Sequence, residues 1–226
     1  VDIPVVCAGR MEPDVGAEAV KEGKIDAVGV ARQFLTDGAW VTKLMEGRME
    51  DIQPCICCHN ACFAMAHYKG VANDEPFSDA KYMARCALNP QTMQGHKYDI
   101  LPAKKRKKIA VVGGGIGGIE VARIAALRGH HVTIYEKTDR LGGVFIQAAA
   151  PSFKEKDREL IEWYRRQIAA LPIHVEYHCE IKTLGELDAD EIVIATGAKA
   201  RKLRLPGIER SMEAIEYLDG KEVGEN

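Results

Sequence analysis

Four cysteines have the spacing of a set that binds a metal or a cluster. Cys55, Cys58 and Cys62 form a C-x2-C-x3-C pattern, and Cys86 follows in a Cys-Ala-Leu-Asn-Pro segment. Four thiolates are the ligands that an iron–sulfur cluster or a structural zinc ion requires. Zinc modules usually pair one C-x2-C with a second one, which this sequence lacks. We therefore expect an iron–sulfur cluster, with zinc or no metal as the alternatives.

Two residues inside this group leave the ligand set open. Cys57 could replace a neighbouring cysteine as a ligand, or it could remain a free, oxidisable thiol. His59 also lies among the cysteines, and we expect it beside the ligands or exposed to solvent rather than bound to the metal. The two remaining cysteines, Cys7 and Cys179, are predicted to be small buried apolar residues.

A glycine-rich segment has the spacing of a dinucleotide-binding turn. Gly113, Gly115 and Gly118 occupy the three glycine positions of G-x-G-x-x-G, between an apolar run and a helical pattern. The first glycine permits a tight turn, the second lets the backbone approach a pyrophosphate, and the third lets the helix pack against the sheet. Glu136 lies 18 residues after Gly118, where a carboxylate binds the hydroxyls of an adenosine ribose. We expect an adenine dinucleotide here, and the alternative is a glycine turn without a ligand.

The elements around this turn alternate as in an α/β domain with a parallel sheet. Apolar runs predict strands at residues 109–112, 132–136, 174–181 and 192–195, and helical periodicity predicts helices at 117–128 and 154–170. The apolar face of the second helix consists of Leu160, Ile161, Tyr164 and Ile168. Five basic residues at 104–108 precede the domain. We interpret them as a solvated linker, with a phosphate or nucleic-acid patch as the alternative.

The first 53 residues predict a parallel βαβ unit. Strands are expected at 3–7 and 25–30 with a helix at 14–22 between them, and a further helix at 37–47 ends in glycine. The periodicity then fades over residues 54–102. Because a loop-rich stretch of that length has little core of its own, we expect a metal cluster to hold it.

Composition excludes several classes of protein. The 226 residues are 46% hydrophobic and 28% charged, which is typical of a soluble globular chain. The formal net charge of -2 provides no strong field toward nucleic acid or an anionic membrane. We find neither an apolar run of about 18 residues nor a secretion signal. We therefore expect a cytoplasmic protein that acts on a small-molecule substrate, with no nucleic-acid or membrane partner.

The motifs and their order resemble a family of iron–sulfur flavoproteins that includes 2,4-dienoyl-CoA reductase, trimethylamine dehydrogenase and 2-enoate reductase. Pro54 and Ile56 match the family's context around its first cysteines, and Asn89-Pro90 follow the last cysteine as in that family. Residues 63–85 form an insertion relative to the family's spacing. The resemblance implies one [4Fe-4S] cluster on four ligands, Cys55, Cys58, Cys62 and Cys86.

The second half resembles the FAD domain of flavoproteins with two dinucleotide domains. Residues 136–143 match E-K-x-x-x-L-G-G, residues 195–197 match the closing A-T-G, and residues 205–208 continue as in that group. This favours FAD, or ADP as in trimethylamine dehydrogenase, over NAD. Val144 stands where the family usually has Gln, so one side-chain hydrogen bond to the cofactor is lost. The implied nucleotide contacts are Gly113, Gly115, Gly117, Gly118, Glu136, Arg140 and, through its backbone, Ile181.

Residues 5–10 and 28–32 resemble the seventh and eighth strands of an old yellow enzyme-type (β/α)8 barrel. The loops after those strands bind phosphate in such barrels. The resemblance implies that Gly9, Arg10, Ala31 and Arg32 hold the phosphate of FMN. The alternative is that the two arginines only close a packed sheet.

Together these features predict three parts: the end of an FMN-binding barrel at 1–53, a cluster segment at 54–103 and an incomplete dinucleotide-binding domain at 104–226. The resemblance implies an NAD(P)H-dependent oxidoreductase that passes electrons from FAD through the cluster to FMN and reduces a C=C bond of an enoate or enoyl-CoA-like substrate. An amine dehydrogenase of the trimethylamine dehydrogenase type is one alternative. A truncated, non-catalytic cofactor-binding subunit is the other.

We expect the chain to be a carboxy-terminal fragment that is incomplete for catalysis, and we identify no catalytic residue in it. Two strands cannot close a barrel, so their apolar faces need a cover. We expect the remainder of the barrel or a second copy of the chain to supply that cover.

Overall fold

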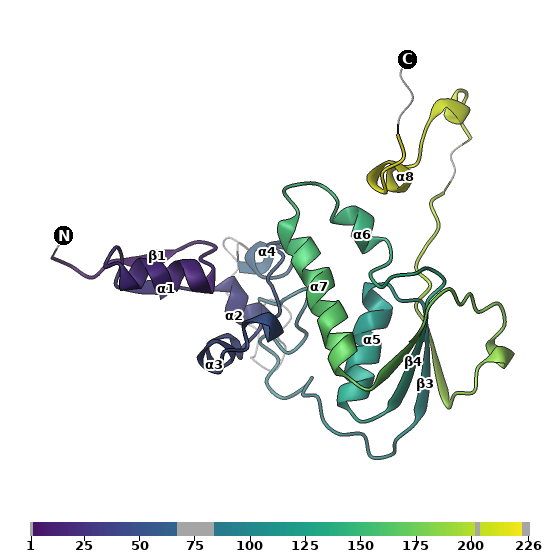
Figure 1. Ribbon diagram of the computed structural model, residues 1–226, viewed down its shortest axis with the longest axis horizontal. Coiled ribbons are helices and arrows are strands. Elements are labelled where there is room, and N and C mark those ends of the chain that lie inside the picture. The colour runs from purple at the N-terminus through teal and green to yellow at the C-terminus, as the bar shows by residue number, and fades with distance from the viewer. Residues whose placement is uncertain (1, 67–83, 202–203, 223–226) are drawn as a thin grey trace. The chain divides into compact units, whose positions relative to one another are not determined.

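The computed structural model describes residues 2–66, 84–201 and 204–222, and they form two compact units, residues 1–99 and residues 100–226. Figure 1 labels the elements of both units. Most of the 63–85 insertion lies outside the described residues. No helix in the described part of the chain is long and apolar enough to span a membrane.

The first unit begins with the predicted βαβ motif. β1 (Val6–Ala8) pairs in parallel with β2 (Ala27–Gly29), and α1 (Pro13–Lys21) connects them. Proline at the start of α1 suits a helix because its missing N–H would be unpaired there in any case. Gly16 lets α1 approach the sheet closely, since a Cβ at this position would lie 2.9 Å from a methyl group of Val28.

Two short helices follow the βαβ motif, and the first of them was not predicted. α2 (Arg32–Thr36) ends directly before Asp37, and α3 (Trp40–Met45) begins three residues after Asp37. The prediction of a helix at 37–47 was therefore wrong at its start. Asp37 leaves the helix because its backbone is extended and its carboxylate accepts the N–H of Ala39. A 3-10 turn (Met49–Asp51) and α4 (Phe63–Ala66) complete this part.

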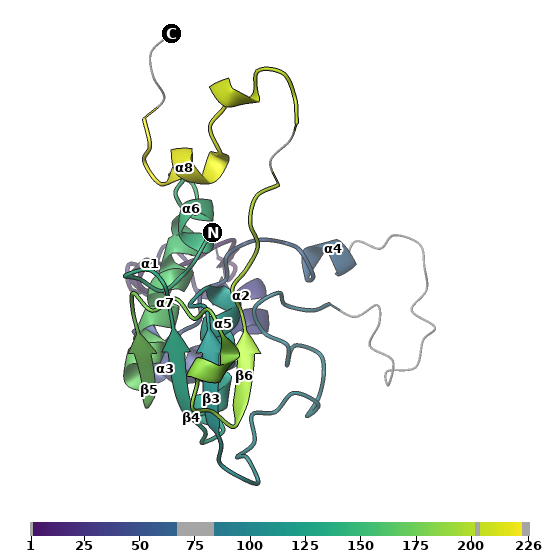
Figure 2. The ribbon, with the colours of Figure 1, turned by 90° about the vertical axis from the view of Figure 1, so that its right-hand side faces the viewer.

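The second unit contains a four-stranded parallel sheet in the order β5-β4-β3-β6. The strands are β3 (Lys108–Val112), β4 (His131–Tyr135), β5 (Ile173–Glu176) and β6 (Glu191–Ile194), and Figure 2 shows them side by side. The α/β class with a parallel sheet is thus confirmed. β5 ends well before the predicted residue 181, because His178 has a positive φ of 55° that breaks the extended backbone.

Two long helices supply most of the core of this unit. α5 (Ile116–Leu127) buries Ile119 and three alanines, and α7 (Glu155–Ala170) packs beside it. The apolar face predicted for α7 is buried together with Trp163. The guanidinium of Arg123 lies 5.3 Å from the ring centre of Trp163 and forms two hydrogen bonds with Glu120. The shorter elements are α6 (Phe145–Ala148), the 3-10 turns Leu184–Glu186 and Ile208–Arg210, and α8 (Ala214–Leu218).

The core contact of α7 yields a stability prediction. Leu160 is only 1% exposed, so Leu160→Ala should lower the free energy of unfolding of the second unit by about 2–5 kcal/mol. Trp40 and Trp163 are the only tryptophans, one in each unit. Urea titration followed by fluorine NMR of 5-fluorotryptophan protein would therefore report each unit separately.

The matched control is Leu127→Ala at the end of α5, where the side chain is 44% exposed. Its effect should be below about 1 kcal/mol, because little apolar area returns to water. Equal losses in the two variants would contradict the assignment of Leu160 to the core.

Candidate functional site

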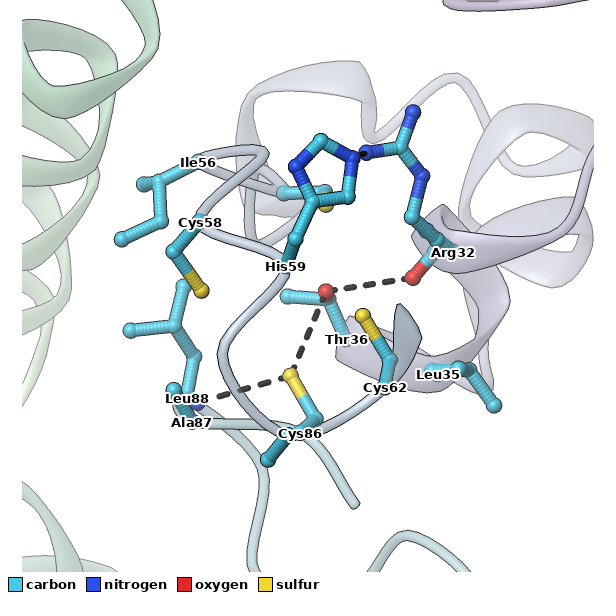
Figure 3. A pocket seen from close by; sticks show the side chains of 12 residues that line it. Arg32, Leu35, Thr36, Ile56, Cys58, His59, Cys62, Cys86, Ala87 and Leu88 are labelled. Carbon is cyan, nitrogen blue, oxygen red and sulfur yellow. Dashed lines mark hydrogen bonds between the residues drawn. The ribbon is translucent and has the colours of Figure 1, made fainter. Parts of the chain in front are cut away.

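The four predicted cluster ligands line one pocket of the first unit. Cys55 and Cys58 lie in the loop before α4, Cys62 directly precedes α4, and Cys86 belongs to the loop at 84–92. Figure 3 shows the sulfur atoms of Cys58, Cys62 and Cys86 directed toward one another across the pocket. Two segments distant in sequence, residues 55–62 and the loop of Cys86, thus bring four thiols to the wall of one small space.

The thiols surround the pocket instead of converging on one point. Among the described residues, no three His, Cys, Asp or Glu side chains are grouped closely enough to hold a single metal ion. Sulfur ligands of zinc must all lie about 2.3 Å from one atom. In an iron–sulfur cluster the cysteines bind different irons, so an arrangement around a wall fits the donor set that a cluster needs.

Cys57 takes a different position from the pocket cysteines. It is absent from the described pocket lining, and its thiol lies 3.6 Å from the carbonyl oxygen of Cys55, to which it donates. Burial raises the pKa of the Cys57 thiol, and the neighbouring Cys55 raises it further, while Arg10 and Arg32 oppose the shift. The sulfur of Cys57 thus bonds to a backbone carbonyl and lies outside the described lining of the pocket, which distinguishes it from the four predicted ligands.

His59 lines the pocket and contacts an arginine. Nη1 of Arg32 donates to Nε2 of His59, which also packs edge-on against the ring of Phe63. Because guanidinium can only donate, the imidazole nitrogen is the acceptor in this contact. His59 therefore lies beside the cysteines, as expected for a neighbour of the ligands.

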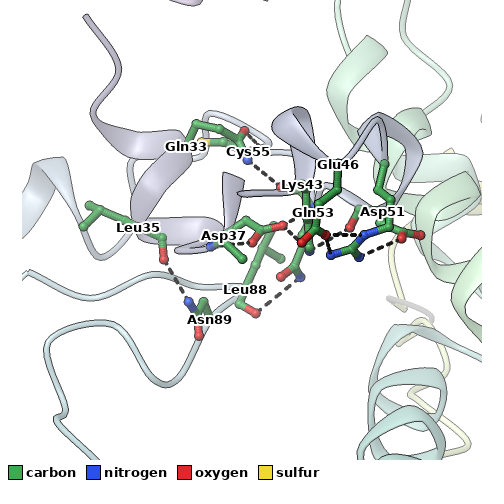
Figure 4. A network of polar contacts seen from close by, with 12 residues as sticks. Gln33, Leu35, Asp37, Lys43, Glu46, Asp51, Gln53, Cys55, Leu88 and Asn89 are labelled. Atoms are coloured by element: carbon green, nitrogen blue, oxygen red, sulfur yellow. Dashed lines mark hydrogen bonds and ion pairs between the residues drawn. The ribbon is translucent and has the colours of Figure 1, made fainter. Parts of the chain in front are cut away.

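A buried carboxylate fixes the loop that leads into the cysteines. Asp37 is 8% exposed, and one of its carboxylate oxygens accepts the Lys43 ammonium at 2.6 Å and the Gln53 N–H at 2.9 Å. Lys43 also donates to the carbonyl of Asp51. Figure 4 shows these contacts converging between α2, α3 and the loop. The backbone just before Cys55 is therefore held in one position at the edge of the pocket.

Two amides connect α2 directly to the cysteine segments. The side chain of Gln33 donates to the carbonyl of Gln53 and accepts the N–H of Cys55. The side-chain amide of Asn89 donates to the carbonyl of Leu35 at 3.0 Å. α2 thus holds both the first cysteine and the segment after Cys86, and the Asn-Pro of the sequence motif has a structural reason.

The predicted FMN phosphate residues follow the carboxyl ends of β1 and β2. Gly9 and Arg10 come directly after β1, with positive φ values of 111° and 54°. Ala31 and Arg32 form the start of α2, two residues beyond β2. Adjacent parallel strands end at one edge of a sheet, so these two loops are neighbours.

At two positions of the glycine loop in the second unit, the backbone leaves no space for any residue other than glycine. A Cβ on Gly113 would lie 2.4 Å from the carbonyl oxygen of Ala195, and one on Gly118 would lie 1.9 Å from the carbonyl oxygen of Gly113. A Cβ on Gly115 would meet only the Cα of Gly143 at 4.0 Å, and one on Gly117 would meet nothing within 4 Å. The loop is therefore closed toward the sheet and open at the positions predicted to face a pyrophosphate.

Glu136 binds the glycine loop itself. It is 6% exposed, and its Oε2 accepts the N–H of Gly114 at 2.6 Å. Its Oε1 accepts both the N–H and the hydroxyl of Thr138 at 2.8 Å. A carboxylate offers about four acceptor positions, and these contacts occupy three of them, so one is left for the two ribose hydroxyls that the sequence motif implies.

The other predicted nucleotide residues lie around this loop. Arg140 pairs with Asp219 at 3.1 Å, and Val144 is an exposed residue at the start of α6. Ile181 is half-buried, in the stretch that follows the hydrogen bond from Cys179 to the carbonyl of Glu136. Their contacts with a nucleotide stay predictions. Cys7 and Cys179 are half-buried, less enclosed than predicted.

Sequence reasoning missed the residues that support the cysteines. Gln33 and Thr36 lie before the helix predicted at 37–47, Asp37 was interpreted only as its first residue, and Thr138, which supports Glu136, was not singled out. A buried Asp or Gln has no spacing signature, because its partners are backbone groups far along the chain. The Asp37-Gly38 pair, which is typical of a turn, is the local signal that could have moved the helix start beyond Asp37.

The network around Asp37 predicts the effect of removing its charge. Asp37→Asn should lower the free energy of unfolding of the first unit by about 2–4 kcal/mol, because Lys43, itself 18% exposed, loses its counter-ion. The Trp40 fluorine signal in a urea titration measures this quantity.

Glu46→Gln provides the control for Asp37→Asn. Glu46 pairs with Arg48 at the surface, with about half of each side chain exposed, and such pairs contribute about 0–1 kcal/mol. A loss for Asp37→Asn no larger than the control's would show that the buried carboxylate does not hold the loop.

The glycine loop predicts unequal effects for two neighbouring glycines. Gly118→Ala should destabilise the second unit by about 1–3 kcal/mol or more, since its methyl group would overlap the carbonyl of Gly113. Gly117→Ala in the same helix should leave stability unchanged or raise it slightly, because space is open and alanine favours a helix. Urea titration of the Trp163 signal compares them, and similar values for both variants would refute the steric account.

Comparisons with known proteins find relatives among flavoprotein reductases and amine dehydrogenases. The chain is 34% identical over 229 residues to cinnamate reductase from Clostridium sporogenes, with all of this chain and 33% of the reductase covered. A solved 2-naphthoyl-CoA reductase in complex with 2-naphthoyl-CoA superposes with a TM-score of 0.83 at 33% identity over 97% of this chain and 32% of that chain. Histamine dehydrogenase from Rhizobium sp. 4-9 has a TM-score of 0.72 at 27% identity over 88% of this chain and 28% of its own.

These relatives confirm the predicted resemblance to flavoprotein reductases and amine dehydrogenases. The chain spans about a third of the length of the relatives it matches. Residues 67–184, more than half of the 226, match the family described as pyridine nucleotide-disulphide oxidoreductase. The chain therefore belongs to the pyridine nucleotide-disulphide oxidoreductase family.

Proposed function

We propose that this chain is the cofactor-binding relay section of an NAD(P)H-dependent flavin oxidoreductase. In this proposal electrons pass from FAD through a [4Fe-4S] cluster to FMN and reduce a C=C bond of an enoate or enoyl-CoA-like substrate. The observation that carries the proposal is the pocket lined by Cys55, Cys58, Cys62 and Cys86. The similarity to a cinnamate reductase and a 2-naphthoyl-CoA reductase supports the reductive direction.

In the proposal the four pocket cysteines hold the cluster. The cluster, when bound, supplies one-electron transfer between two flavins. The protein's part is to hold the thiols in place through α2 and to exclude water with the apolar residues that line the pocket, Leu35, Ile56 and Leu88. Burial of this kind tunes the reduction potential.

The glycine loop supports binding of FAD, or of ADP, in the second unit. The open positions at Gly115 and Gly117 leave space for a pyrophosphate, and α5 directs the free N–H groups of its first turn to that space. The remaining acceptor position of Glu136 suits an adenosine ribose. The family to which the chain belongs supports a nicotinamide nucleotide as the electron donor.

The loops after β1 and β2 are proposed to hold the phosphate of FMN. Arg10 and Arg32 follow the carboxyl ends of the paired strands β1 and β2, where two guanidinium groups would attract phosphate. Apolar side chains of this βαβ motif are exposed, among them Val6, Val15 and Val20. We propose that the rest of a barrel, or a second copy of the chain, covers them.

A second candidate function is the oxidation of an amine, with electrons running outward to a carrier. The likeness to histamine dehydrogenase favours it. Substrate reduction by NAD(P)H discriminates between the two, because an amine dehydrogenase would reduce its flavin with an amine and not with a nicotinamide nucleotide.

The proposed function is tested by cofactor analysis of the chain purified without oxygen. We expect about four irons per chain, a visible spectrum of an iron–sulfur protein, and bound adenine nucleotide. Cys58→Ser should lose most of the iron, because Cys58 lines the pocket, whereas Cys57→Ser should retain it.

Different outcomes of this test would contradict different parts of the proposal. One zinc per chain, or no metal, would overturn the cluster. Loss of iron from Cys57→Ser with retention in Cys58→Ser would reverse the assignment of these two thiols.

A further inference from the structure

Thr36 places a hydroxyl group against the sulfur of Cys86. Thr36 ends α2 and is 2% exposed. Its Oγ1 lies 3.5 Å from Sγ of Cys86 and donates toward the carbonyl oxygen of Arg32 at 3.2 Å, as Figure 3 shows. The backbone N–H of Leu88 donates to the same sulfur at 3.4 Å. Two donor groups from separate segments thus reach one thiol.

The direction of the contact depends on the state of the sulfur. A threonine hydroxyl carries one hydrogen and two lone pairs, and either atom of the pair can donate while Cys86 is a thiol. A thiolate has no hydrogen, so Thr36 alone can then donate. The carbonyl of Arg32 competes for that hydrogen, and a more negative sulfur attracts it more strongly.

We propose that the Thr36 hydroxyl raises the reduction potential of the cluster by donating a hydrogen bond to Cys86. This inference rests on the proposed function. Reduction adds an electron whose charge is shared by the sulfur ligands, and hydrogen bonds to those sulfurs are among the factors that set a cluster's potential. Because the donor stabilises the more negative state more strongly, the reduced form gains more than the oxidised form. Thr36 is a positioning residue, since it acts through a ligand.

The pocket makes this hydrogen bond effective. Thr36 is buried and the pocket also contains Leu35, Ala87 and Leu88, so little water competes with the hydroxyl and the local dielectric is low. The side chain has little room to turn away, because Thr36 is 2% exposed at the end of α2.

The experiment compares variants of the full chain, with Thr36→Ala beside those described next, all purified or reconstituted with iron and sulfide without oxygen. Thr36→Val keeps the volume of the side chain but removes the hydroxyl, and Thr36→Ser keeps the hydroxyl. Thr92→Val is the matched control, because Thr92 is also buried and its hydroxyl donates to the carbonyl of Leu35 at 2.6 Å. Iron content is measured first, and then the midpoint potential by electron paramagnetic resonance during a redox titration.

The proposal predicts a more negative potential for Thr36→Val. The shift should approach tenfold in the one-electron equilibrium constant, which corresponds to about 59 mV. Thr36→Ser and Thr92→Val should keep the potential of the wild type. A merely structural role of Thr36 would not produce this pattern, because the serine variant also lacks the methyl group.

Other outcomes overturn the inference. A Thr36→Val protein with full iron content and unchanged potential would exclude the hydrogen bond as a determinant. If Thr36→Val and Thr36→Ala both lose iron while Thr36→Ser retains it, the hydroxyl is needed for assembly of the site and not for its potential. Wild-type chain without iron would overturn the proposed function, and the inference would fall with it.

Discussion

The buried carboxylate of Asp37 is the constraint on which the cysteine unit depends. The segments that carry the cysteines have almost no regular secondary structure, and the sheet beside them has only two short strands. A unit with so little regular structure buries too small an apolar core to hold its loops in place. Asp37 can, because Lys43 and two backbone N–H groups satisfy it and any movement of the loop would leave a charge buried without partners. Gln33 then extends the same constraint to the backbone of Cys55.

The second unit uses the same physical principle for a different ligand. Glu136 lies at the end of β4, and its carboxylate holds the N–H of Gly114 and both donors of Thr138. These bonds fix the glycine loop on the side of the sheet, while the space beside Gly115 and Gly117 stays open. In each unit a buried acid bonded to backbone N–H groups organises a loop beside the proposed cofactor. Such preorganisation means that binding does not have to order the loop.

Much of the nucleotide domain could be predicted because its signals are local. The apolar runs of β3, β4 and β6 and the periodicity of α5 and α7 identified these elements to within one or two residues. β5 was predicted too long, since a positive φ at His178 leaves no mark in a polar-apolar alternation. The glycines could be interpreted because their spacing reflects steric contacts, such as that of Gly118 with the carbonyl of Gly113.

The cysteine unit was less accessible to sequence reasoning. The spacing of the cysteines predicted which thiols share a pocket. The hydrogen bonds that hold these segments in place connect residues far apart in the sequence. Asn89 reaches Leu35 and Gln53 reaches Leu88, and neither contact follows from periodicity. α2 was missed for the same reason, and the helix predicted to begin at Asp37 begins at Trp40, because Asp37 bonds to partners that only the folded chain brings together.

The central claim is that four cysteines around one pocket hold an iron–sulfur cluster. Mössbauer spectroscopy of the chain produced with ⁵⁷Fe and purified without oxygen tests it most directly, because the spectrum reports the number of irons, their sulfur ligation and their valence. We predict the signals of one cubane cluster with four irons per chain. A spectrum of mononuclear iron, or the absence of iron together with one zinc per chain, would contradict it.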